Sequence, residues 1–259
     1  MSNPRAYYND NDQKVCAWLR ELIKRGLIAD GDVDDRSICD VKADDVRGYN
    51  QCHFFAGISG WALAVQLAGL QDEEGVWSAS CPCQPWSIGN TWQGGGRGYD
   101  DRRHLFPELF RLVEQCRPRK LFGEQVPGAV KKGWLDTVFD SLEGIGYSCR
   151  ATVFPTRIIG TKHERKRLWW CAYTSGSGWK GHKPLKSILE PATTPLPVDG
   201  NPLARAWSAL DGNIDGLLHC NGLSVQLERD AVKAFGNSIV PEAAAEFIQA
   251  CEEVMEVFK

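Results

Sequence analysis

An α/β fold with a largely parallel β-sheet is the architecture that the sequence predicts. Short apolar runs of strand character alternate with segments of helical periodicity, a pattern typical of βαβ units. Polar residues follow three of the apolar runs directly, in the stretches FAGISG, SCPCQPW and GEQV. Ligands bind at the carboxyl ends of parallel strands, so these stretches predict an active site at one edge of the sheet.

Helices and strands are expected in alternation along the chain. Apolar residues at helical spacing predict helices in five segments: 14–25, 61–70, 104–116, 134–146 and 243–258. Buried strands are expected at the start of four segments: 52–61, 76–87, 120–126 and 147–155. Residues 30–46 are acidic and rich in turn formers. Residues 174–202 show little periodicity, which predicts an insertion or a small appended region.

The composition is that of an ordinary soluble protein. The chain has 259 residues, of which 43% are apolar and 24% charged, and it is long enough for one sizeable core. No stretch approaches the roughly 20 apolar residues of a membrane helix, and the polar first residues are unlike a signal peptide. The ten cysteines are scattered. We therefore expect reduced thiols in a cytoplasm rather than a disulfide scaffold.

Charge is distributed unevenly in a chain whose formal net charge is −3. Residues 157–186 contain eight Lys and Arg but one acid, Glu164, whereas the segment from Glu242 onward contains five Glu and one Lys. A basic segment in an acidic protein suits a groove that meets phosphate on one face only. A solvated basic loop is the alternative.

The sharpest chemical feature is Cys83, which stands between Pro82 and Gln84 after an apolar run. A cysteine at a strand end, on a loop stiffened by proline, is displayed for attack on an electrophile as a thiolate. A structural thiol is one alternative. A metal site built on Cys81 and Cys83 is another, but the Cys-x-Cys spacing is not that of structural zinc sites and no further ligand pair accompanies it. We therefore expect no metal.

Five motifs occur in order within residues 54–241. They are FAGISGW at 55–61, PCQ at 82–84, GEQV at 123–126, HERKR at 163–167 and GNSIVP at 236–241. Together they resemble the motifs of the DNA cytosine-5 methyltransferases, here with Gln125 in place of an asparagine and His163 in place of a glutamine. The resemblance implies a Rossmann-like methyltransferase sheet that binds S-adenosylmethionine (SAM), with helices on both faces, and a small target-recognition region.

The resemblance implies a catalytic role for four residues: Cys83, Gln84, Glu124 and Arg165. In this family's mechanism a cysteine thiolate adds to C6 of cytosine, which makes C5 able to attack the sulfonium methyl group of SAM. By resemblance Cys83 is that thiolate, Glu124 binds N3 and the exocyclic amine, and Arg165 helps to place the ring. A stacked base cannot reach the cysteine, so the family flips it out of the duplex.

Cofactor contacts are implied in the same way for one set of residues: Phe55, Ala56, Gly57, Ile58, Gly60, Trp61, Pro82, Asn237 and Ser238. In the family, the cofactor loop is followed by two further strands before the Pro-Cys motif, but here the interval has room for only one helix and one strand. We therefore hypothesise that the second and third strands precede the first. Asp10 then holds the ribose hydroxyls, and Ser37 and Ile38 border the adenine, with Ser37 in place of an acid. An unrelated helical extension over residues 1–45 is the alternative.

The implied partner is double-stranded DNA, bound by a monomer in the cytoplasm of a bacterium or of a phage-infected cell. Phosphate contacts are expected from five basic residues: Arg97, Arg167, Lys180, Lys183 and Lys186. Arg97 belongs to a glycine-rich segment after Cys83 that is a candidate to close over the flipped base. The expected organisation is a catalytic domain at 1–171, a recognition region at 172–222 and a returning segment at 223–259.

Three alternatives stay open. A tRNA-modifying branch shares this chemistry and fold, so RNA cytosine is a rival substrate. Thymidylate-synthase-like chemistry also adds a cysteine to pyrimidine C6, but on a free nucleotide, and the cofactor loop argues against it. A catalytically impaired DNA-binding relative is the third, because Ser37, Gln125 and His163 depart from the family's residues.

Overall fold

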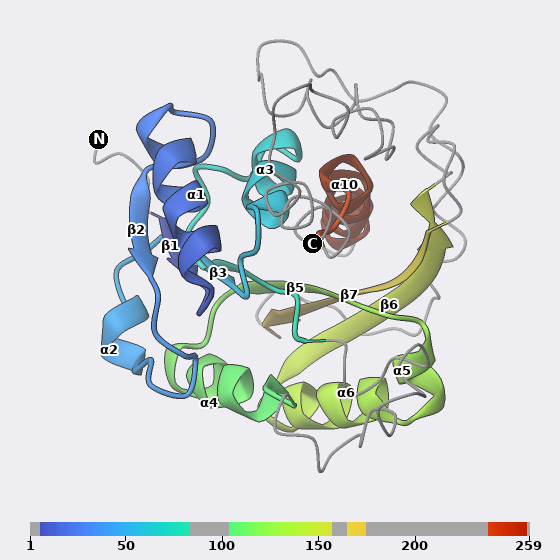
Figure 1. Cartoon of the computed structure of the whole chain (residues 1–259). Coiled ribbons are helices and arrows are strands. Elements are labelled where there is room, and N and C mark those ends of the chain that lie inside the picture. Colours follow the sequence, from blue (N-terminus) through green and yellow to red (C-terminus); the bar gives the residue numbers. More distant parts are fainter. Residues whose placement is uncertain (1–5, 83–103, 157–164, 175–237, 258–259) are drawn as a thin grey trace, which may run out of the picture.

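The computed structural model describes residues 6–82, 104–156, 165–174 and 238–257, and the structural statements below concern these residues. They form one sheet with the strand order β2-β1-β3-β4-β5-β7-β6 (Figure 1). The strands are β1 (Ala6–Asn9), β2 (Gly31–Asp34), β3 (Gln51–Phe54), β4 (Val76–Ala79), β5 (Lys120–Gln125), β6 (Tyr147–Pro155) and β7 (Lys166–Thr174). The helices are α1 (Gln13–Lys24), α2 (Ala43–Val46), α3 (Gly60–Leu67), α4 (Phe106–Cys116), α5 (Gly128–Lys131), α6 (Trp134–Gly144) and α10 (Pro241–Val257).

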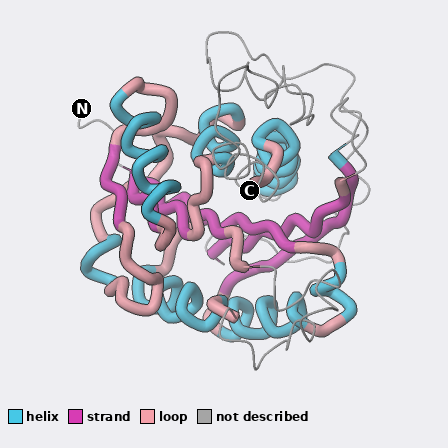
Figure 2. The backbone as a smooth tube through the Cα atoms, viewed as in Figure 1, coloured by secondary structure: helices cyan, strands magenta, loops and turns pink. Residues whose placement is uncertain are grey.

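The sheet is largely parallel, which confirms the predicted fold class. β2, β1, β3, β4 and β5 pair in parallel, whereas β7 is antiparallel to both of its neighbours, β5 and β6. Helices cover both faces (Figures 1 and 2): α1, α3 and α10 lie on one side, and α4, α5 and α6 on the other. The carboxyl ends of β1, β3, β4 and β5 therefore meet at one edge.

The two N-terminal strands lie beside β3. β1 pairs with β3, with Asn9 opposite Phe54, and β2 lies outside β1 at the edge of the sheet. α1 follows β1 where the Asp12 carboxylate accepts the N–H of Lys14 at 2.9 Å, a helix N-cap. Two strands that precede β3 in sequence thus occupy the places beyond it in space, an order that fits the hypothesis of a rearranged motif order.

Aromatic packing fixes the face of the sheet under α3 and α10. The ring of Trp61 on α3 lies 6.5 Å from Phe122 on β5 and 5.8 Å from Trp169 on β7. Phe247 on α10 contacts the same two rings, at 6.5 Å and 6.1 Å. All four side chains are buried, so they contribute both buried apolar area and ring–ring contacts to the core.

β7 is absent from the expectations based on sequence. Its first residues belong to the charged HERKR motif, which favours a loop. The residues that follow, LWWCAY, are apolar on both faces, because β7 lies between two strands in a sheet that helices cover. The strand continues to Thr174 and so crosses the domain boundary expected at residue 171. Within the described part of the chain, no helix is both long and apolar enough to cross a membrane. The eight described cysteines are free.

Candidate active site at the carboxyl edge of the sheet

The turn between β3 and α3 has a strained backbone. Phe55 and Ser59 have φ angles of 52° and 76°, values that cost a non-glycine residue about 1–2 kcal/mol, and Gly57 between them has a φ of 53°. Ser59 is buried, and its Oγ has no hydrogen-bond partner among the described residues. Strain and an orphaned hydroxyl in one turn are features of ligand sites rather than of ordinary connections.

Asp10 joins the end of β1 to this turn. Its two carboxylate oxygens accept the N–H groups of Gly57 and Asp12, each at 3.0 Å. Burial raises the pKa of the carboxyl group, and the two hydrogen bonds oppose that shift. The structure therefore places Asp10 against the predicted cofactor loop, as the rearrangement hypothesis requires.

Ser37 and Ile38 lie in the loop after β2, near the same edge. The buried amide of Asn9 donates to the carbonyls of Asp34 and Arg36, at 3.2 Å and 2.9 Å, which ties this loop to the residue before Asp10. The Ser37 hydroxyl accepts the N–H of Cys39 at 3.3 Å. The backbone N–H groups of Ser37 and Ile38 have no hydrogen-bond partner within the described ranges.

The closing GNSIVP motif contacts the start of α3. A Cβ on Gly60 would stand 2.6 Å from Cγ1 of Ile239 and 3.3 Å from Oγ of Ser238. Only glycine allows this approach, so the close packing of the two motifs explains why Gly60 begins the helix. Ser238 therefore lies beside the start of α3 and the turn that precedes it.

Two side chains hold the segment that leads into Cys83. Trp61 donates its indole N–H to Oγ of Ser80 at 2.9 Å, and Gln125 donates its amide to the carbonyl of Cys81 at 3.2 Å. The oxygen of the same amide accepts the N–H of Val126 at 3.0 Å, which fixes its orientation. We call this arrangement the Ser80–Cys81 clamp; it joins α3 and β5 to the end of β4.

Cys81 is packed rather than reactive. Its thiol is buried, and burial raises its pKa to about 12, so it stays protonated at neutral pH. The described residues contain no cluster of histidine, cysteine and acidic side chains that could hold a metal ion. The reactive thiol of this segment is thus to be sought at the next cysteine, Cys83.

Glu124 is a buried carboxyl group at the end of β5. Its Oε1 forms an ion pair with Nε of Arg167 on β7, and the charge of Arg165 also acts on it. Burial raises the pKa of Glu124, and the two arginines lower it by less, so the net shift is upward. The arrangement combines two cationic side chains with a buried carboxyl group whose pKa is raised.

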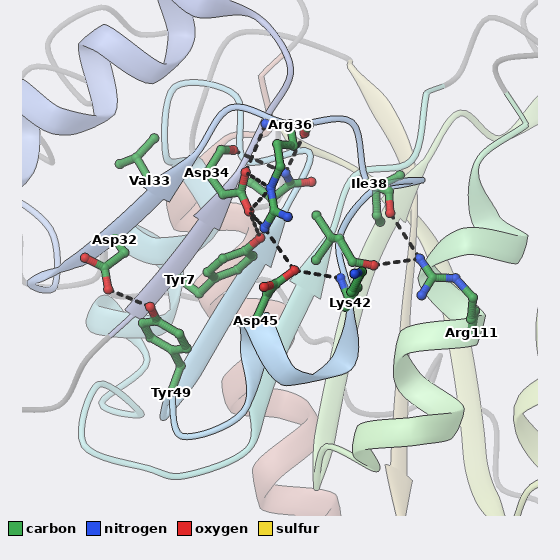
Figure 3. A network of polar contacts seen from close by, with 12 residues as sticks. Tyr7, Asp32, Val33, Asp34, Arg36, Ile38, Lys42, Asp45, Tyr49 and Arg111 are labelled. Carbon is green, nitrogen blue, oxygen red and sulfur yellow. Dashed lines mark hydrogen bonds and ion pairs between the residues drawn. The ribbon is translucent and has the colours of Figure 1, made fainter.

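Sequence reasoning missed several residues that hold the site together. The indole nitrogen of Trp61, a residue expected to contact the cofactor, donates to Ser80, and this hydrogen bond was not foreseen. Asn9 and the donor role of Gln125 had no signal in the sequence, because each acts on a residue more than 15 positions away along the chain. Arg111 on α4 is similar: it donates to the carbonyls of Ile38 and Val41, at 3.2 Å and 2.9 Å (Figure 3).

Several predicted residues lie outside the described ranges. These are Cys83, Gln84, Arg97, Lys180, Lys183, Lys186 and Asn237. The recognition region expected at 172–222 is described only up to Thr174. Their roles stay predictions.

Comparison with protein families identifies the relationship. The family described as C-5 cytosine-specific DNA methylase matches residues 70–201, just over half of the chain. The chain belongs to this family. The match begins after α3 and includes the segment leading into Cys83, the end of β5 that carries Glu124, and β7.

Curated relatives of this family member match it over a shorter length. The type II methyltransferase M.MspI of Moraxella sp. is 30% identical over 98 residues, which are 37% of this chain and 23% of that protein. The type II methyltransferase M.NgoPII of Neisseria gonorrhoeae is 28% identical over 113 residues, 42% of this chain and 32% of that protein. The matched part of the chain thus spans about a quarter to a third of the length of these relatives.

Solved structures share the fold over nearly the whole chain. A mutant of Spodoptera frugiperda DNMT2 superposes with a TM-score of 0.56 at 12% identity and covers 94% of this chain and 91% of its own. S. pombe Dnmt2 gives a TM-score of 0.54 at 12% identity, with 96% and 99% covered. At this identity the likeness establishes the Rossmann-like fold and no more.

Proposed function

We propose that the protein is a DNA cytosine-5 methyltransferase that uses Cys83 as its nucleophile and SAM as its methyl donor. Membership of the family supports the reaction class. The observation that carries the proposal is the linkage at the ends of β4 and β5. Gln125, next to the buried Glu124, holds the carbonyl of Cys81, two residues before Cys83. The strand end that carries Glu124, the carboxyl group proposed to bind the cytosine, is thus hydrogen-bonded to the segment that leads into the proposed nucleophile Cys83.

The chain's own groups account for the reaction steps in order. The Cys83 thiolate bonds to C6 of cytosine, and the electrons of the C5–C6 double bond move toward N3. Glu124 binds N3 and the exocyclic amine and limits the charge that develops on the ring. Bound SAM would supply the electrophilic sulfonium methyl group that C5 takes, and S-adenosylhomocysteine would be the leaving group. Loss of the C5 proton to water expels the thiolate and restores the aromatic ring.

The open polar groups at the sheet edge fit a nucleoside cofactor. Asp10 is a carboxylate suited to ribose hydroxyls, and the free N–H groups of Ser37 and Ile38 suit an acceptor atom of a heterocycle. The orphaned hydroxyl of Ser59 lies just before α3, whose first N–H groups favour a carboxylate. The residues assigned to SAM are Asp10, Ser37, Ile38, Phe55, Ala56, Gly57, Ile58, Gly60, Trp61, Pro82, Asn237 and Ser238, with Trp61 acting through the clamp.

Duplex DNA is the proposed substrate, and a monomer in the cytoplasm of a bacterium or phage-infected cell the proposed form. A base must leave the stack to reach Cys83, and Arg165 and Glu124 receive it at the edge of the sheet. Arg97, Lys180, Lys183 and Lys186 are assigned to phosphates. Arg167 is engaged by Glu124, so its contribution to phosphate binding is expected to be small.

The decisive test is base-resolution mapping of 5-methylcytosine in a bacterial host that lacks its own cytosine methylation. We expect methylation in one recurring sequence context with the wild-type chain and none with Cys83→Ala. Cys116→Ala, which removes a thiol on α4, is the matched control and should methylate like the wild type. The purified proteins are assayed in parallel on transfer RNA. Methylation of RNA alone, or SAM binding without turnover on either substrate, would contradict the proposal.

A further inference from the structure

The loop that carries Ser37 and Ile38 sits at an exposed margin of the fold. It runs from β2 to α2 over residues 35–42 without regular secondary structure. β2 is the edge strand and pairs only with β1 within the described sheet. Such a loop has few backbone neighbours, so side chains must hold it if it is to keep one conformation.

Arg36 bridges the two ends of this loop. Its guanidinium donates to the Asp34 carboxylate from Nε at 3.0 Å and from Nη2 at 2.6 Å, and Nη2 also donates to Oδ2 of Asp45 at 2.9 Å (Figure 3). Asp34 ends β2 and Asp45 lies in α2. The carboxylate of Asp45 also accepts the N–H of Lys42 at 2.8 Å, where α2 begins. The side chain of Arg36 thus connects the end of β2 to α2 across the loop.

The two carboxylates are held in their charged form. Burial acts to raise the pKa of Asp34, but hydrogen bonds from Arg36 and from the hydroxyl of Tyr7, the latter at 2.6 Å, hold it below its ordinary value. The N–H of Lys42 and the guanidinium of Arg36 lower the pKa of Asp45. The bridge is therefore fully charged throughout the neutral range.

Two further elements anchor the backbone of the loop. Asn9 on β1 holds the carbonyls of Asp34 and Arg36, and Arg111 on α4 holds those of Ile38 and Val41. These contacts engage the loop's acceptors. The N–H groups of Ser37 and Ile38 have no hydrogen-bond partner among the described residues. The loop therefore has a fixed shape with its free donors grouped at two consecutive residues.

We propose that Arg36 is a positioning residue for the cofactor, whose bridge from Asp34 to Asp45 holds the Ser37–Ile38 segment in its binding shape before the cofactor arrives. This inference rests on the proposed function, since it takes SAM as the ligand of that segment. Arg36 acts through the loop. A loop that adopts the binding shape for only a tenth of the time binds its ligand about tenfold more weakly.

The test is calorimetric binding of S-adenosylhomocysteine to the full-length chain with no DNA present. Arg36→Gln should raise the Kd about tenfold, and Asp45→Asn, which removes one arm, by a smaller factor. Arg36→Lys keeps the positive charge but lacks the planar guanidinium that contacts both carboxylates, so its Kd should lie between those of the wild type and Arg36→Gln. Arg47→Gln is the matched control. It removes an ion pair of the same short helix and its cap, that of Arg47 with Asp44, with exposed fractions of 60% and 85%, together with the hydrogen bond between Arg47 and Cys116.

Steady-state kinetics separate positioning from a loss of folding. Arg36→Gln should raise KM for SAM about tenfold and leave kcat and KM for DNA unchanged. Equal binding by wild type and Arg36→Gln, or a uniform loss of kcat and of both affinities, would overturn the inference while leaving the proposed function intact. A wild-type chain that binds no S-adenosylhomocysteine would overturn both.

Discussion

Two halves of the candidate site are held together by different forces. The cofactor half consists of β1, β2 and the loop 35–42, and its Arg36 bridge is partly open to water, with exposed fractions of 45% for Arg36 and 32% for Asp45. The catalytic half consists of the ends of β4, β5 and β7. There the Glu124–Arg167 pair has exposed fractions of only 11% and 20% and lies beside the aromatic core of Trp61 and Trp169.

The difference determines what substitutions in each half will do. The partly exposed ion pairs and hydrogen bonds of the cofactor half can lose one contact while the sheet stays folded. A substitution there should therefore lower ligand affinity. A buried ion pair cannot lose one partner without leaving the other charge in a poor environment. Damage in the catalytic half should therefore appear in kcat and in the free energy of unfolding.

The largest effect is expected from Glu124→Gln. The amide keeps the shape of the carboxyl group but cannot donate to N3 in the same way, and it leaves Arg167 without its counter-charge. We expect kcat to fall by about 10²–10³, the usual cost of one stabilising group, with the Kd for S-adenosylhomocysteine unchanged. Glu114→Gln, at an exposed position of α4, is the control. Wild-type kcat in Glu124→Gln would show that the cytosine binds elsewhere.

Acid should destabilise β3, the strand that lies between the two halves. His53 on β3 is fully buried, and burial lowers its pKa from 6.5 to about 3. Below pH 6.5 the unfolded chain takes up a proton that the folded chain refuses, so this contribution to stability is lost as pH falls from 6.5 toward 3. The loss approaches 1.4 kcal/mol per pH unit, or about 4–5 kcal/mol over the interval.

Denaturant unfolding at pH 7, 6 and 5 measures this slope. His53→Gln should flatten it, because the amide keeps partners for Ser78 and Gln51 without titrating. His104, whose pKa burial also lowers, is less buried, so His104→Gln should flatten the slope less. A slope that is the same in wild type and His53→Gln would show that His53 is not the titrating group.

A smaller effect is expected from the Ser80–Cys81 clamp. Ser80→Ala leaves the buried indole N–H of Trp61 without its acceptor, which costs about 1–3 kcal/mol of stability. It also loosens the segment before Cys83, and we expect kcat to fall about tenfold with KM for SAM unchanged. Ser141→Ala removes a comparable hydroxyl on α6, which donates to the carbonyl of Thr137 at 2.7 Å, and should leave kcat unaltered. A rise in KM for SAM alone would place the clamp in the cofactor half.

The sequence predicted features that depend on neighbouring residues in a motif, but not contacts between residues that are far apart along the chain. The motifs predicted which strand ends carry polar residues, and the gap between them predicted the displaced strands. They did not predict β7. Its first residues belong to a motif with four charges in five residues, which favours a loop, whereas the buried apolar residues come later in the strand. Nor did they predict Arg36 as a bridge. Nothing near Arg36 in sequence shows that the fold brings Asp45, nine positions away, within 2.9 Å.

The smallest effect should come from salt, and it should separate the two halves most cleanly. Raising NaCl from 0.1 M to 1 M shortens the Debye length from about 10 Å to about 3 Å and screens exposed charges more than buried ones. The Arg36 bridge is the more exposed ion pair, so the wild-type Kd for S-adenosylhomocysteine should rise about twofold. Arg36→Gln has no bridge to screen, and its Kd should change less over the same range. If the two proteins respond equally, the salt dependence arises from the ligand or from other charges, and the bridge is as protected from solvent as the Glu124–Arg167 pair.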